Sequence, residues 1–134
     1  MVNVMIVEDN AAFGKLLQHQ LADMGISDVS TATGGAEALE ILRQDTAVDV
    51  ILCDWHMEPM DGLDFCASAQ SISTERGRVV PIVFMTADAK LADADKRARM
   101  LEPARQIGIV DVLSKPFDAD DLKTVLRNAG FAIP

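Results

Sequence analysis

A short apolar stretch that ends in a carboxylate constrains this chain most. Residues 48–53 are apolar except for Asp49, several of them are β-branched, and they lead directly into Asp54. A near-continuous apolar run of this length is typical of a strand covered on both faces, as in a parallel sheet. Such sheets bind their ligands at the carboxyl ends of the strands. We therefore interpret Asp54 as a nucleophile that accepts a phosphoryl group.

Further apolar segments alternate with helical patterns along the rest of the chain. Apolar residues at helical spacing predict helices between the strands, and Asn10 and Asp118 are expected to cap the first and the last helix. The polar residues from Ser71 to Arg78 are predicted to form a loop. Besides the central run, the predicted strands are residues 4–7, 29–32, 82–85 and 110–113.

This alternation predicts an α/β fold, a flavodoxin-like, doubly wound sheet of five parallel strands with helices on both faces. The most apolar strands belong in the middle, and the second and fifth, which polar residues interrupt, suit the edges. The expected strand order is therefore 2-1-3-4-5, with a switch point between the first and third strands. The length of 134 residues suits a single domain over residues 1–134 without an output domain.

Composition excludes several classes of function. The net charge of −9 argues against a broad surface for DNA or an anionic membrane, because both reward clustered lysine and arginine. No apolar stretch is long enough for membrane insertion, and the N-terminus lacks a signal-peptide pattern, so we expect a cytoplasmic protein. Cys53 and Cys66 have no zinc-site spacing, and Cys53 is expected to be buried and reduced.

Polar side chains follow four of the predicted strands: Glu8 and Asp9, Asp54, Thr86, and Lys115. In the expected order the first and third strands are neighbours, so Asp9 and Asp54 should face each other. Three carboxylates and one ammonium group sum to a charge of −2, which is costly unless a cation compensates it. Hard oxygen ligands favour Mg2+ over zinc or copper.

Each of these residue types has a role in phosphoryl transfer. Asp54 can attack a phosphoryl group and become an acyl phosphate. Mg2+ and Lys115 offset the charge on the phosphoryl oxygens, and Thr86 can donate a hydroxyl to one of them. A single carboxylate at the end of a strand is often only a helix cap or a solvated loop residue. It is the joint placement at the ends of four strands that favours a site.

With these residues, the chain resembles the receiver domain of bacterial two-component response regulators, in particular the single-domain chemotaxis-regulator type (CheY-like). The similar segments cover essentially the whole chain in the same order. They are Ile6–Asn10, Asp54 with Pro59 and Asp61–Gly62, Met85–Ala87, and Leu113–Phe117.

The resemblance implies that a sensor histidine kinase or a histidine phosphotransfer protein supplies the phosphoryl group to Asp54. It implies a Mg2+ site formed by Glu8, Asp9, Asp54 and the backbone carbonyl of His56. Thr86 and Lys115 would contact the phosphoryl group, and a cis peptide bond would precede Pro116. Such a domain is not an enzyme beyond its own phosphorylation and dephosphorylation, and its output is a contact with a downstream protein.

The sequence departs from the family pattern near its output region. Val112 stands where the family usually has an aromatic residue, and the chain has no tyrosine. Output is therefore expected through the loop after Thr86 or the helix beyond it. The segment Ala87–Gly108 is longer than usual by roughly two helical turns. Its cationic side is either a solvated helix face or a docking surface for an acidic partner or phosphate-bearing ligand; it comprises Lys96, Arg97, Arg99 and Arg105.

Three residues flank the predicted phosphorylation site, and two other functions share part of its chemistry. His56 and Asp88 are placed to influence the lifetime of the acyl phosphate, and Trp55 should report on the site by fluorescence. The chain could also be an intermediate phosphate carrier in a phosphorelay. A phosphatase with an aspartyl nucleophile is a different class, but it needs an acid two residues after the nucleophile, where His56 stands. Retention of Asp9, Asp54, Thr86 and Lys115 argues against a pseudo-receiver that is never phosphorylated.

Overall fold

The computed structural model describes most of the sheet and the helices that pack on it. The described residues are 2–44, 47–55, 62–75, 77, 79–87, 95, 98–99, 102, 108–115 and 117–133.

Five parallel strands form one sheet in the order β2-β1-β3-β4-β5. This confirms the predicted α/β architecture and strand order. Each observed strand lies within one or two residues of its predicted position. The strands are β1 Asn3–Val7, β2 Asp28–Ala32, β3 Val50–Asp54, β4 Ile82–Thr86 and β5 Ile109–Ser114.

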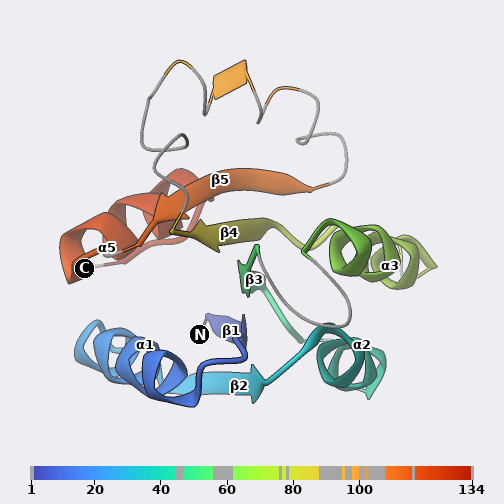
Figure 1. Ribbon diagram of the computed structural model, residues 1–134, viewed down its shortest axis with the longest axis horizontal. Coiled ribbons are helices and arrows are strands. Elements are labelled where there is room, and N and C mark those ends of the chain that lie inside the picture. Colours follow the sequence, from blue (N-terminus) through green and yellow to red (C-terminus); the bar gives the residue numbers. More distant parts are fainter. Residues whose placement is uncertain are drawn as a thin grey trace.

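Helices cover both faces of the sheet. In Figure 1, α1 and α5 lie on one face and α2 and α3 lie on the other, as expected for right-handed crossovers between parallel strands. The helices are α1 Ala11–Asp23, α2 Gly35–Gln44, α3 Gly62–Glu75 and α5 Ala119–Asn128. Across the described residues, none of the helices is both long and apolar enough to span a bilayer.

The central strands are buried at every residue, whereas β2 and β5 include partly exposed positions. Successive side chains of a strand point to opposite faces, so the central strand β3 contributes to two separate cores. Val50 and Leu52 pack with the residues of α1 and α5. Ile51 and Cys53 pack with those of α2 and α3. The same alternation directs Asp54 toward the face of α1 and α5.

The prediction of a loop from Ser71 to Arg78 is wrong for residues 71–75, because these residues continue helix α3. Ile72 and Ser73 are both buried, so this turn of the helix packs on the core despite its polar sequence. The Ser73 hydroxyl donates to the Ala69 carbonyl oxygen at 2.9 Å, which satisfies its hydrogen-bonding capacity inside the helix. Gly77, with a φ of 76°, ends the helix by donating its N–H to the Thr74 carbonyl at 3.0 Å.

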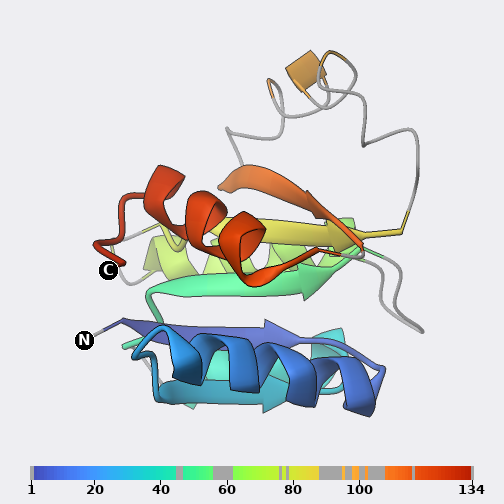
Figure 2. The ribbon, with the colours of Figure 1, turned by 90° about the vertical axis from the view of Figure 1, so that its left-hand side faces the viewer.

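Both predicted caps on the α1 and α5 face are confirmed. The Asn10 side chain accepts from the Phe13 N–H, and Asp118 forms a capping box with Asp121. Figure 2 shows all strands pointing the same way, with α1 and α5 beginning at the edge where the strands end. The carboxyl ends of the strands and two helix N-termini therefore meet at one edge.

Candidate functional site

Main-chain hydrogen bonds hold the residues that follow the strands. The Glu8 N–H donates to the Ala32 carbonyl at 3.0 Å, and the Lys115 N–H donates to the Thr86 carbonyl at 2.7 Å. The Trp55 N–H donates to the Met85 carbonyl at 2.9 Å. Hydrogen bonding between strands thus continues past their ends. Because of this, the polar residues at the carboxyl edge are held by the sheet rather than by loops.

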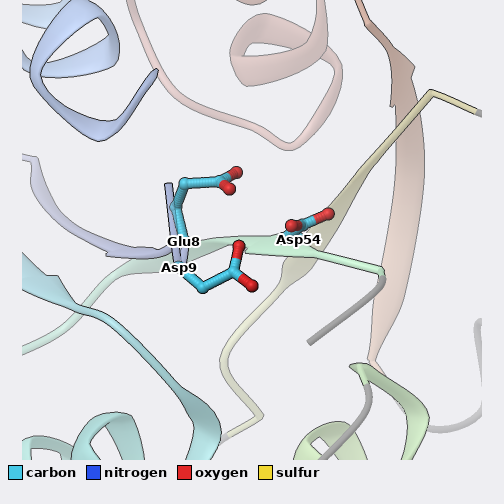
Figure 3. A group of neighbouring side chains, drawn as sticks. All are labelled: Glu8, Asp9 and Asp54. Carbon is cyan, nitrogen blue, oxygen red and sulfur yellow. The ribbon is translucent and has the colours of Figure 1, made fainter. Parts of the chain in front are cut away.

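Three carboxylates gather at this edge. Oxygen atoms of Glu8, Asp9 and Asp54 all lie within 4.8 Å of one another, and Figure 3 shows the three side chains turned toward a common space. Glu8 and Asp54 are buried, whereas Asp9 is exposed to solvent. The structure therefore brings together the acidic residues that the sequence singled out, from the ends of the neighbouring strands β1 and β3.

The Lys115 ammonium group lies between two of these carboxylates. Its Nζ is 2.9 Å from Glu8 Oε2 and 3.6 Å from Asp54 Oδ1. The other Glu8 oxygen, Oε1, accepts from the Asn10 N–H at 3.2 Å. Both oxygens of the buried glutamate are therefore hydrogen-bonded, as a buried carboxylate requires. Among the described residues, one cation faces three anions, so the cluster keeps an excess of negative charge.

This environment raises the pKa of Glu8 above its ordinary value of 4.5. Burial is the largest cause and the charge of Asp54 adds to it, while the hydrogen bond from Lys115 acts in the opposite direction. The folded protein thus binds this proton more tightly than the unfolded chain does. The resulting stabilisation is present at low pH and is lost as the pH rises through the raised pKa.

An aromatic pair adjoins the lysine. The Lys115 Nζ lies 4.3 Å from the centroid of the Phe13 ring, within the range of a cation–π interaction. The Phe13 ring in turn meets the Phe117 ring edge to face, with centroids 5.6 Å apart. In the sequence, Phe13 is only one of the apolar residues at helical spacing, in the segment that forms α1. Its helical spacing carries no signal that a lysine from the far end of the chain would lie on its ring.

Thr86 is buried at the end of β4, one residue beyond the strand partner of Asp54. Trp55 is half-buried, and its ring meets that of Phe84 edge to face at 4.9 Å. Val112 is buried and is the strand partner of Phe84. Cys53 and Cys66 are both buried, as expected for Cys53, and burial raises the pKa of the Cys66 thiol to about 11.

Several predicted features lie outside the described residues. They include the carbonyl of His56, the flanking Asp88, and the peptide bond before Pro116. Only isolated residues of the predicted basic segment are described, among them Arg99, which is exposed. Also outside are Pro59, Asp61, Lys96, Arg97 and Arg105.

Comparison with known proteins agrees with this geometry. The family model for the response regulator receiver domain matches residues 4–127. The chain belongs to the response regulator receiver family. This bacterial two-component family includes the chemotaxis protein CheY1 of Helicobacter pylori, which is 28% identical over 94% of this chain and 94% of that protein.

Other relatives are longer. The transcriptional regulatory protein GlrR of Escherichia coli is 32% identical over 95% of this chain, but the chain spans only 26% of its length. Among solved structures, the chemotaxis protein CheY4 of Vibrio cholerae has a TM-score of 0.78 and 26% identity, covering 96% of this chain and 98% of that one. A response regulator receiver protein from Pseudomonas putida has a TM-score of 0.74 and 27% identity, covering 94% and 95%.

Proposed function

We propose that this receiver domain accepts a phosphoryl group on Asp54 with Mg2+ as its cofactor. One observation carries the proposal: a carboxylate at the end of the central strand lies within 4.8 Å of two further carboxylates and 3.6 Å from the Lys115 ammonium group. A purely structural ion pair would not need three anions around one lysine, because the excess charge lowers stability. The arrangement suits a divalent cation and an incoming phosphate.

The donor set fits Mg2+. Glu8, Asp9 and Asp54 offer carboxylate oxygens, which are hard ligands, and Asp9 is exposed so that the edge is open to water. The resemblance to the receiver family implies the backbone carbonyl of His56 as a fourth ligand. When bound, Mg2+ would neutralise part of the negative charge on the phosphoryl oxygens.

In the proposed step, one oxygen of the Asp54 carboxylate attacks the phosphorus of a phosphohistidine donor. The new oxygen–phosphorus bond forms while the phosphorus–nitrogen bond of the donor breaks, and its electron pair stays on the imidazole nitrogen. Lys115 offsets the charge spread over the phosphoryl oxygens, and the Thr86 hydroxyl donates to one of them. Hydrolysis reverses the modification when water attacks the phosphorus and the Asp54 carboxylate leaves. The protein would thus be modified and restored rather than act as an enzyme on other molecules.

The proposed partners follow from this chemistry. A sensor histidine kinase or histidine phosphotransfer protein would supply the phosphoryl group. The added charge next to Thr86 would alter the adjoining segment Ala87–Gly108, which would then contact a downstream protein. We place this exchange in the cytoplasm, where thiols such as the two buried cysteines stay reduced.

Incubation with acetyl phosphate followed by intact-mass measurement tests the proposal. The wild-type protein should gain the mass of one phosphoryl group when Mg2+ is present and should gain none when a chelator removes it. Asp54→Asn should gain none in either condition. The exposed Asp28→Asn variant is the matched control, because it removes one aspartate away from the site. An equal mass gain in wild type and Asp54→Asn would refute the assignment.

A further inference from the structure

Within the described part of the chain, three groups contact the ammonium group of Lys115. Two are the carboxylates of Glu8 and Asp54, and the third is the face of the Phe13 ring. The lysine side chain is only 19% exposed. An ammonium group has three N–H donors and no fixed direction of approach, and its four-carbon stem is flexible. Its position therefore depends on what surrounds it.

We propose that Phe13 is a positioning residue for phosphoryl transfer, which acts by holding the Lys115 ammonium group over its ring. This inference rests on the proposed function of the site and assigns a role to a residue outside its acidic cluster. Phe13 is not a member of the acidic cluster formed by Glu8, Asp9 and Asp54. It acts through the lysine.

The ring is the contact of Lys115 that Mg2+ does not compete for. Glu8 is both the nearest ion-pair partner of Lys115, at 2.9 Å, and a member of the acidic cluster. When Mg2+ binds to the Glu8 carboxylate, the attraction between Glu8 and Lys115 becomes weaker. The Asp54 carboxylate likewise loses its negative charge, and thus its attraction for Lys115, when one of its oxygens bonds to phosphorus. The ring keeps its attraction for the ammonium group throughout, so it restrains Lys115 next to the phosphoryl oxygens.

The surroundings of Phe13 give the ring a fixed place. Its N–H donates to the Asn10 side chain at 3.1 Å, in the cap of α1. The edge-to-face contact with Phe117 limits rotation of the ring. Phe13 and Phe117 both pack against the core between the sheet and the α1 and α5 helices. A ring anchored by a helix cap, an aromatic neighbour and a core is rigid enough to orient a flexible lysine.

A fluorination series at position 13 separates this role from packing. Successive ring fluorines weaken the attraction for a cation while nearly keeping the shape of phenylalanine. The rate constant for phosphorylation by acetyl phosphate at saturating Mg2+ should fall stepwise with each fluorine. Phe13→Leu should lower it about three- to tenfold, the range that a partly buried cation–π contact supports. Phe13→Tyr keeps an electron-rich ring and should restore a rate near that of wild type.

A second readout and a matched control exclude a general structural effect. The dissociation constant of Mg2+, followed by Trp55 fluorescence, should stay unchanged across the series because Phe13 is not a ligand. Phe131→Leu removes a partly buried ring from the same core. Among the described residues this ring has no cation–π contact, so the substitution should leave the rate unchanged. A flat rate across the fluorinated proteins would overturn the role of Phe13 while wild type is still phosphorylated. Failure of wild type to be phosphorylated would instead refute the proposed function.

Discussion

Replacement of Asp54 by asparagine should make the Mg2+-free protein more stable. The substitution removes one of three crowded negative charges while keeping the size of a buried side chain. Like charges held close together lower stability unless a counter-ion compensates them. A higher free energy of unfolding after removal of the proposed phosphoryl acceptor would show that the charge of Asp54 destabilises the fold when no Mg2+ is bound.

The magnitude follows from the distances. At 4.8 Å, the upper limit of the separation between the carboxylate oxygens, two unit charges repel by about 1 kcal/mol in a water-like medium and about 3 kcal/mol at an effective dielectric constant of about 20. Asp54 has two such neighbours. The Lys115 ammonium group, at 3.6 Å, attracts the Asp54 carboxylate by about 1 to 5 kcal/mol over the same range. Summed over these three described neighbours, the repulsion exceeds the attraction in both limits, and the expected gain is about 0.5 to 2 kcal/mol.

Urea denaturation with and without Mg2+ measures this gain. Without Mg2+, Asp54→Asn should unfold at a higher urea concentration than wild type. The exposed control Asp28→Asn should stay within about 0.5 kcal/mol of wild type. With Mg2+ at a hundredfold excess over its dissociation constant, wild type should gain about 2.7 kcal/mol and Asp54→Asn clearly less. A loss of stability in Mg2+-free Asp54→Asn would refute the charge argument.

Three further outcomes can be measured. Gly108→Ala should destabilise the protein by about 0.5 to 1.5 kcal/mol more than Gly77→Ala in urea denaturation. Both glycines have positive φ, and a Cβ at Gly77 would meet open space, whereas a Cβ at Gly108 would displace the Gln70 amide group, which donates to the Val80 carbonyl at 3.3 Å. Equal losses would contradict this. In calorimetric titrations, the Mg2+ affinity should fall as the pH decreases through the raised pKa of Glu8, because protonated Glu8 is not a ligand. This fall should begin at a higher pH than an ordinary pKa of 4.5 would give. An affinity that does not change with pH down to 4.5 would contradict the role of Glu8 as a ligand. Mg2+ should change the fluorescence of Trp55, because this residue follows Asp54 directly and its backbone N–H donates to the Met85 carbonyl in β4. An unchanged spectrum would show that the indole does not sense the site.

The fold could be predicted because its signals are local. Continuous apolar runs indicated buried parallel strands, and the polar interruptions in β2 and β5 correctly indicated edges. The last turns of α3 were missed because Ser73 satisfies its hydroxyl within the helix and Ile72 packs on the core. Polar composition in a short segment does not reveal that kind of tertiary burial.

The acidic part of the site was predictable for the same reason, since parallel strands place their carboxyl ends at one edge. What could not be predicted is the partner of each charge. That Lys115 lies nearer to Glu8 than to Asp54, and that the Phe13 ring covers its ammonium group, depends on side-chain packing between distant segments. Those contacts leave no trace in spacing or periodicity.

Mapping the modified residue tests the central claim most directly. After treatment with acetyl phosphate and Mg2+, borohydride reduces an aspartyl phosphate to homoserine, which sequencing of peptides by mass spectrometry locates. Homoserine at position 54, absent when Mg2+ is chelated, is the predicted result. Homoserine at any other aspartate, or unchanged labelling without Mg2+, would contradict the account.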